Sequence, residues 1–265
     1  MYQHHFGMTQ APLDKNNQDL WDDGYLQPLV ERFGWLLKSP GVGLLIGDVG
    51  VGKTAALRQM TQSLNPHRYQ VIYLAETDFG RADLYRGLAL ALGLEPVYRR
   101  AQLWRDIKAR IHELSRQKNR LPLWIIDEAQ NLPQTFFRDL PSFLNFAFDT
   151  EDLMSVWLVG LPSLAYTLER APYAALASRI QVRLKLEPIQ SRERFAALIE
   201  HALKAVGCQQ PLMSDSGLEY LRQAAQGSPR QAGTILRHAL RLAVPKQLNH
   251  LPDELIQQAI KEQRL

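Results

Sequence analysis

The stretch Gly47-Asp-Val-Gly-Val-Gly-Lys53-Thr54 decides the fold, because it matches the pattern G-x-x-x-x-G-K-[ST] of a phosphate-binding loop. Its glycines permit backbone angles at which successive N–H groups point at phosphate oxygens. Lys53 supplies a positive charge for the β- and γ-phosphates, and the hydroxyl of Thr54 is a ligand for Mg²⁺. A short apolar run at residues 43–46 precedes the loop and a helix is predicted from Lys53, which is the context that such a loop requires.

The predicted helix places the positive end of its dipole at the phosphates, so the nucleotide is expected to contact the whole loop. The expected contact residues are Gly47, Asp48, Val49, Gly50, Val51, Gly52, Lys53, Thr54 and Ala55.

A second motif, Leu123-Trp-Ile-Ile-Asp127-Glu128, consists of an apolar strand that ends in two acids. On its own, such a strand end is common. Together with the phosphate loop it indicates an ATP-hydrolysing site, in which Asp127 holds Mg²⁺ with Thr54. Glu128 is then placed to orient and deprotonate the attacking water.

Buried strands are predicted at residues 43–46, 71–75, 122–126, 155–160 and 181–186. Helices are predicted between them, at residues 25–38, 53–64, 83–92, 101–116, 133–148 and 164–170. This alternation predicts an α/β fold with a five-stranded parallel sheet between helices. Helical spacing also predicts a core position for five phenylalanines, Phe136, Phe137, Phe143, Phe146 and Phe148.

After Pro188 the strands stop, and helices are predicted at residues 191–206, 214–226, 229–243 and 252–261. We therefore expect an N-terminal extension at 1–24, an α/β core at 25–188 and a helical lid at 189–265.

The composition excludes several classes of protein. The 265 residues are 46% hydrophobic and 22% charged, as in globular proteins, and one cysteine, Cys208, rules out an internal disulfide. Neither a signal peptide nor an apolar run long enough to span a bilayer is present, so we expect a cytoplasmic protein. The net charge is +4, whereas residues 98–120 alone carry +6.

Two arginines complete the motif set, Arg179 in Ala177-Ser-Arg-Ile180 and Arg230 in Gly227-Ser-Pro-Arg230. The order of phosphate loop, Asp127-Glu128 and these arginines resembles that of AAA+ ATPases. Within them the sequence is similar to the ExeA-like ATPases and to the transposition ATPases TniB, MuB and TnsC. The segments that carry this similarity are Tyr2 to Phe6-Gly7, Asp48 to Thr54, Ile126-Asp-Glu-Ala-Gln130 and Val159-Gly-Leu-Pro162.

The resemblance implies an AAA+ core with a helical lid, and ATP with Mg²⁺ as cofactors. It implies that Arg179 reaches the γ-phosphate bound to a neighbouring subunit, that Arg230 is the sensor of the lid, and that Phe6 packs near the adenine. Both arginines would supply positive charge to the transferring phosphoryl group. The alternatives are a solvated strand-edge arginine at 179 and a helix-capping or paired arginine at 230.

Leu161 departs from the family pattern. AAA+ proteins usually have a polar residue at the end of the fourth strand, and ExeA-like sequences have Gly-Gln-Pro there, whereas this sequence has Gly160-Leu-Pro162. A leucine side chain cannot hydrogen-bond water or phosphate. This departure argues against fast hydrolysis and leaves nucleotide binding intact.

The basic segment predicts a helix with an apolar side at Leu103, Trp104, Ile107, Ile111 and Leu114, so its charges lie on the other side. One interpretation is an ordinary solvated face. The other is contact with phosphates of duplex DNA. In the related transposition ATPases, subunits wind around DNA and basic residues after the second strand line the channel. The candidates here are Arg81, Arg99, Arg100 and Lys108.

The leading hypothesis is an ATPase that forms a ring or filament on duplex DNA and regulates DNA transposition with a transposase, and with a targeting protein in some systems. The second hypothesis is an ExeA-type ATPase of secretion and envelope assembly. In that group a membrane span and a wall-binding part follow the ATPase, and neither is found before Leu265, so we expect the DNA-linked function. The third hypothesis is a nucleotide-gated binding module with little hydrolysis, because of Leu161.

Overall fold

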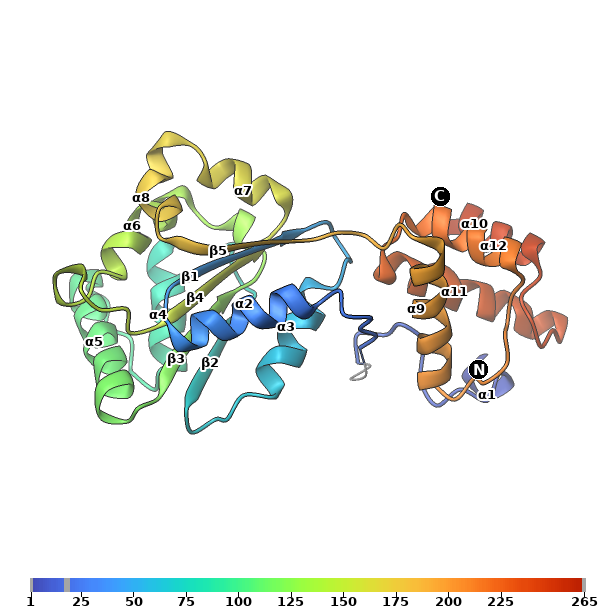
Figure 1. Cartoon of the computed structure of the whole chain (residues 1–265), viewed down its shortest axis with the longest axis horizontal. Helices are drawn as coiled ribbons and strands as arrows, with labels where there is room; N and C mark the ends of the chain where they lie inside the picture. Colours follow the sequence, from blue (N-terminus) through green and yellow to red (C-terminus); the bar gives the residue numbers. More distant parts are fainter. Residues whose placement is uncertain (1, 17–19, 264–265) are drawn as a thin grey trace. The chain divides into compact units, whose positions relative to one another are not determined.

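The computed structural model describes residues 2–16 and 20–263. The chain divides into two compact units, which Figure 1 shows with the labels used below. The sheet unit comprises Gly24–Gly47 and Leu57–Leu186. The helical unit comprises the segment Asp48–Ala56, the described residues up to Asp23 and the described residues from Glu187 onward. Each unit has its own hydrophobic core.

The sheet unit contains five strands, β1 (Val42–Gly47), β2 (Tyr69–Leu74), β3 (Leu121–Ile126), β4 (Ser155–Gly160) and β5 (Ile180–Leu186). Their order is β2-β3-β4-β1-β5, and every pair of neighbours is parallel. The predicted five-stranded parallel sheet is therefore confirmed. β3 and β4 are buried almost throughout because helices cover both faces of the sheet, which explains their continuous apolar sequences.

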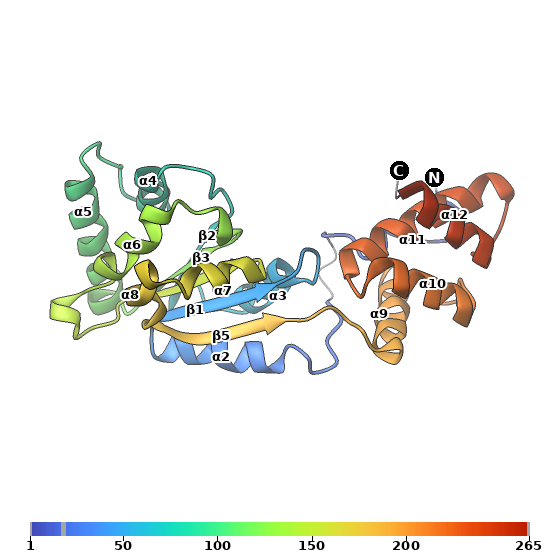
Figure 2. The same cartoon turned by 90° about the horizontal axis from the view of Figure 1, so that it is seen from above.

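Helix α2 (Gln27–Lys38) covers one face, where Phe33 stacks on Trp157 of β4 with ring centroids 5.6 Å apart. The opposite face carries the larger core, beneath the helices that lie above the sheet in Figure 2. These helices are α4 (Arg81–Ala91), α5 (Arg100–His112), α6 (Gln134–Phe143), α7 (Pro162–Leu168) and α8 (Ala174–Ala177). Gly43 permits the close packing of α2, because a Cβ there would lie 2.7 Å from Trp157 and 2.8 Å from Leu36.

The strand order positions the candidate site. Because all strands are parallel, the segments that follow β1, β3 and β4 leave from one edge of the sheet. β4 lies between β1 and β3, with Ile46 paired to Gly160 and Ile126 paired to Leu158. The phosphate loop after β1, the acids after β3 and Leu161 after β4 thus begin at the same edge, which is where ligands bind in open parallel sheets.

The helical unit is built from α9 (Arg192–Ala205), α10 (Asp215–Ala225), α11 (Pro229–Ala243) and α12 (Asp253–Gln263). Helix α3 (Lys53–Gln62) begins at the end of the phosphate loop. Its first turn belongs to the helical unit, and its residues from Leu57 onward belong to the sheet unit. Ser191, Ser214 and Ser228 cap α9, α10 and α11, since each hydroxyl accepts a hydrogen bond from the backbone N–H three residues later.

The described residues up to Asp23, which lie within the expected N-terminal extension, belong to this helical unit. A short helix α1 (Tyr2–His5) begins them, and both Tyr2 and Met8 are buried in the helical core. Thr9 donates its backbone N–H to the carbonyl of Val206 at 2.8 Å. In residues 2–16 and 20–263, no helix is both long and apolar enough to cross a membrane.

The predicted helix over residues 133–148 is too long. It ends at Phe143, and Ala147, Phe148 and Asp149 have φ values of 46°, 58° and 66°, in the left-handed region. Side chains tolerate that region poorly, so the helical periodicity fails there. The predicted core position is wrong for Phe148, whose side chain is fully exposed, and holds for the other four phenylalanines.

Candidate active site

The phosphate loop requires its glycines for two different reasons. Gly50 and Gly52 have φ values of 80° and 102°, which favour glycine. A Cβ at Gly50 would also lie 2.6 Å from the Oγ of Ser228 and 2.8 Å from the Cβ of Arg230. A Cβ added at Gly52 would meet no described residue within 4 Å apart from its neighbours along the chain, so only the backbone angle requires glycine there.

Lys53 is buried, with 7% of its surface exposed, at the first position of α3. Its Nζ donates a hydrogen bond to the carbonyl of Asp48 at 3.0 Å, within the loop itself. The loop therefore holds the ammonium group next to its own backbone. In phosphate loops, backbone N–H groups and a lysine together surround a phosphate.

The start of α11 lies against the phosphate loop. The backbone N–H of Arg230 donates to the carbonyl of Gly50 at 3.3 Å, and the Oγ of Ser228 donates to the carbonyl of Val49 at 3.5 Å. Ser228 is 6% exposed. The Gly227-Ser-Pro-Arg230 motif thus serves partly to attach this helix to the loop. The sequence predicted Arg230 and missed Ser228, although both stand in that motif.

The first acid of the second motif, Asp127, is buried directly after β3, with 3% of its surface exposed. Its carboxylate accepts hydrogen bonds from the hydroxyl of Tyr73 at 2.9 Å and from the backbone N–H of Glu128 at 2.9 Å. Burial and the neighbouring Asp127 raise the pKa of Tyr73, so this hydroxyl stays protonated and remains a donor. Tyr73, on β2, is a site residue that the sequence analysis missed, because it reads as an ordinary strand residue.

Glu128, unlike Asp127, is exposed and has a strained backbone. Its φ of 51° and ψ of 35° lie in the left-handed region, which costs free energy for a residue with a side chain. The hydroxyl of Thr77 donates to its carbonyl at 3.1 Å, and its carboxylate accepts from the Nε2 of Gln130 at 2.6 Å. Such local strain is commonly found at functional sites, where it fixes the direction of a side chain.

The donor set fits Mg²⁺ better than a metal held by protein alone. Among the described residues, no cluster of three His, Cys, Asp or Glu side chains could hold a metal. Mg²⁺ is usually bound by one or two carboxylates together with substrate phosphates. Asp127 is a buried carboxylate, and Thr54 is the hydroxyl residue that closes the phosphate-loop motif.

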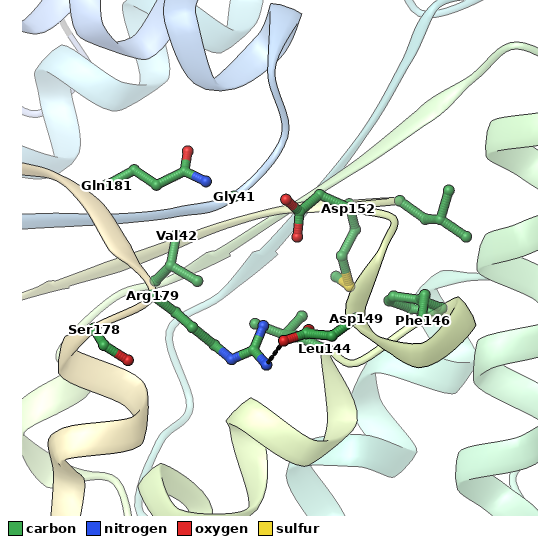
Figure 3. Close-up of a pocket in the computed structure, with 11 residues that line it drawn as sticks. Gly41, Val42, Leu144, Phe146, Asp149, Asp152, Ser178, Arg179 and Gln181 are labelled. Carbon is green, nitrogen blue, oxygen red and sulfur yellow. Dashed lines mark hydrogen bonds and ion pairs between the residues drawn. The ribbon is translucent and has the colours of Figure 1, made fainter.

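Arg179 immediately precedes β5. It therefore lies at the amino-terminal ends of the parallel strands, whereas Asp127 and Glu128 follow the carboxyl-terminal end of β3. Its Nη2 lies 2.7 Å from the Oδ2 of Asp149, toward which the guanidinium turns in Figure 3. Both line a pocket of about 280 Å³, together with Asp152, whose pKa burial raises. A strand of six residues separates its two ends by roughly 15–20 Å at about 3.3 Å per residue. Arg179 is therefore far from Glu128 of the same chain.

Arg81 and Arg100, two of the predicted DNA contacts, share one carboxylate. Arg81, at the start of α4, and Arg100, at the start of α5, lie 3.0 and 2.9 Å from the Oδ2 of Asp139 on α6. Each remains 39% exposed. Two guanidinium groups around one carboxylate leave an excess of positive charge at this surface. Arg99, just before α5, is exposed.

Lys108 differs from these arginines. Its Nζ donates to the carbonyls of Ser142 and Asn145, at 3.3 and 2.7 Å, and lies 5.0 Å from the ring centroid of Phe146. Partial burial lowers its pKa. These contacts are those of a cation that caps the end of α6, so Lys108 fits a structural role better than a DNA contact.

Phe6 belongs to the helical unit and packs against its core, with its ring centroid 4.9 Å from that of His5. The Nε2 of His5 lies 2.9 Å from the carbonyl of Leu248. These contacts anchor the N-terminal segment. The contact of Phe6 with adenine stays a prediction.

A parallel sheet in the order β2-β3-β4-β1-β5, with a phosphate loop after β1 and an Asp-Glu pair after β3, is the fold of an AAA+ P-loop NTPase. Residues 37–168 match the AAA_22 family, described as an AAA domain. A search of curated proteins gives no match. The match to the AAA_22 family covers residues 37–168 alone.

Solved structures support the same fold. The chain is similar to Cdc6p from Pyrobaculum aerophilum, with 18% identity, a TM-score of 0.71 and coverage of 98% of this chain and 70% of that one. It is also similar to the ORC1 protein of Aeropyrum pernix in complex with DNA, with 19% identity, a TM-score of 0.69 and coverage of 94% and 68%. The ORC2 protein of the same organism, in ADPNP–ADP complexes, gives 17% identity, a TM-score of 0.69 and coverage of 94% and 71%.

Proposed function

We propose that this chain binds ATP with Mg²⁺ and hydrolyses it. The observation that carries the proposal is the pair at the end of β3, in which a buried Asp127 is followed by an exposed Glu128 with a strained backbone. Thr54 and Asp127 would hold the metal, which would neutralise charge on the phosphates when bound. Lys53 would bind the β- and γ-phosphates. Glu128 would accept a proton from the attacking water.

The two arginines receive different roles in this proposal. Arg230 would act on nucleotide bound to its own chain, since its backbone contacts the phosphate loop at Gly50. Arg179 would act on the nucleotide of a neighbouring subunit, because it lies at the edge of the sheet opposite to Glu128. This division requires an oligomer.

We further propose that the oligomer binds the phosphate backbone of duplex DNA and regulates DNA transposition. The motifs are similar to those of the transposition ATPases, and the similar ORC1 protein was solved in complex with DNA. The excess positive charge of Arg81 and Arg100 around Asp139 also supports contact with phosphates. A second candidate, a nucleotide-gated binding module with little hydrolysis, is favoured by the apolar side chain of Leu161 at the end of β4.

One experiment tests these proposals together. The protein is imaged by electron microscopy with duplex DNA and a non-hydrolysable ATP analogue, and ATP turnover is measured on the same preparation. We expect regular assemblies on DNA only with nucleotide, and measurable turnover. Assemblies without turnover would favour the binding module. Turnover without any DNA-bound assembly would contradict the transposition role and favour the secretion ATPase.

A further inference from the structure

Gln130 bridges the candidate base and the end of β4. Its Nε2 donates to the Oε2 of Glu128 at 2.6 Å, and its Oε1 accepts from the backbone N–H of Leu161 at 3.1 Å. Only one orientation of the amide satisfies both partners, because the carboxylate can only accept and the N–H can only donate. The amide nitrogen and the amide oxygen of Gln130 therefore each have a defined hydrogen-bond partner.

Gly160 makes room for this bridge. A Cβ at Gly160 would lie 2.5 Å from the Oε1 of Gln130 and 3.4 Å from its backbone nitrogen. The approach of 2.5 Å to the Oε1 is closer than real Cβ atoms come, so a side chain here would displace the amide of Gln130, whereas the distance to the backbone nitrogen is an ordinary contact. Because Gly160 has no side chain, the Oε1 of Gln130 can reach the backbone N–H of Leu161.

The bridge completes the restraints on Glu128. Thr77 holds the carbonyl of Glu128, and Asp127 accepts from its backbone N–H, so the main chain is fixed from two sides. The carboxylate, however, is on an exposed side chain with several rotatable bonds. Its hydrogen bond from Gln130 is to a charged acceptor, which makes it stronger than a neutral one.

We propose that Gln130 is a positioning residue, which holds the Glu128 carboxylate in one direction and couples it to the end of β4. In this way it supplies at that strand end the polar group that the side chain of Leu161 lacks. The inference rests on the proposed ATP hydrolysis, and it concerns the orientation of the base and not the binding of nucleotide.

Two substitutions at Gln130 separate its two hydrogen bonds. Gln130→Glu keeps an acceptor for the N–H of Leu161 but removes the donor to Glu128 and adds a like charge. Gln130→Met removes both bonds at similar length. We expect kcat to fall at least about tenfold in both variants, because a misdirected base loses much of its effect. ATP affinity and the KM for ATP should stay within about twofold of the parent.

A third variant, Gly160→Ala, displaces the amide without changing Gln130, and it should lower kcat in the same way. The matched control is Gln117→Glu, the same chemical change at an exposed position outside the site. Steady-state ATPase kinetics, affinity for a fluorescent ATP analogue and thermal denaturation are measured for each variant. Gln117→Glu should match the parent in all three.

The outcomes are distinct. If the parent hydrolyses ATP and the Gln130 variants match its kcat, the positioning role is overturned while the proposed hydrolysis stands. A rise in kcat would also overturn it, since Gln130 would then hold Glu128 away from its task. Parallel losses of affinity and kcat would indicate a merely structural role. A parent without turnover would overturn the proposed hydrolysis, and the role of Gln130 with it.

Discussion

The backbone N–H of Arg230 donates to the carbonyl of Gly50 at 3.3 Å, so the first turn of α11 is attached to the centre of the phosphate loop. The phosphate loop and this helix are therefore joined through a main-chain contact. A side chain at Gly50 would disturb both, because it would meet Ser228 and Arg230.

We expect Gly50→Ala to lower the free energy of unfolding by about 1–3 kcal/mol, because it combines a left-handed φ with a steric clash. ATP affinity should fall as well. Gly52→Ala should lose less stability, since only its backbone angle is unfavourable. Gly34→Ala, within α2 and with no atom near its Cβ, should be neutral or stabilising by up to about 1 kcal/mol. Chemical denaturation measures all three. An equal loss at Gly50 and Gly52 would exclude the clash as the cause.

Removing the lysine of the loop should weaken nucleotide binding. Lys53→Ala deletes the cation that we propose binds the β- and γ-phosphates, and we expect ATP affinity to fall at least about tenfold, or about 1.4 kcal/mol. Isothermal titration calorimetry measures this change. The control is Lys204→Ala, a half-exposed lysine paired with Glu200 on α9, which should bind ATP like the parent. Unchanged affinity in Lys53→Ala would refute the assignment of the phosphate loop.

Glu128→Gln should bind ATP and fail to hydrolyse it, because an amide does not accept the proton of the attacking water. Phosphate release should drop to background in a coupled assay, while affinity for ATP is retained. Glu169→Gln, an exposed carboxylate at the end of α7, should hydrolyse ATP at the parental rate. Parental turnover in Glu128→Gln would assign the base to another group.

Arg179 should act across a subunit boundary. We expect Arg179→Ala to bind ATP normally and to hydrolyse it poorly, since its charge no longer reaches the neighbouring γ-phosphate. Mixing it with Glu128→Gln should restore activity, at sites where an intact Glu128 meets an intact Arg179. Asp149→Asn breaks the same ion pair and keeps the arginine, so it should remain active. Absence of recovery in well-mixed oligomers would argue against a role in trans.

The predicted DNA contact should depend on salt and little on sequence, because phosphate contacts release counterions. Arg81→Ala, and Arg99→Ala combined with Arg100→Ala, should weaken binding to every duplex similarly. Each lost contact should reduce the salt slope by about one. Lys204→Ala is again the control. Fluorescence anisotropy at two salt concentrations, with and without a non-hydrolysable analogue, makes the measurement. Nucleotide-independent binding would contradict the proposed switch.

The sequence predicted the sheet well because its strands are nearly continuous apolar runs, and β4 was predicted with the boundaries that it has. It singled out Asp127 and Glu128 as candidate site residues because strand-end carboxylates and a phosphate loop form a specific pair. It did not predict Tyr73, which meets Asp127 only through the pairing of β2 with β3. Nor did it predict the exposure of Phe148, because helical spacing says nothing about a left-handed turn.

The burial of Cys208 has a practical consequence for the chemistry of the whole chain. It is the single cysteine of the sequence, it is 6% exposed, and burial raises the pKa of its thiol. Since the thiolate is the nucleophile, maleimides should modify the native chain slowly. A thiol introduced at an exposed position, as in Phe148→Cys, would then react selectively. A dye or cross-linker at this position, which lies after the end of α6 and next to Asp149, would report directly on whatever surface comes to cover it.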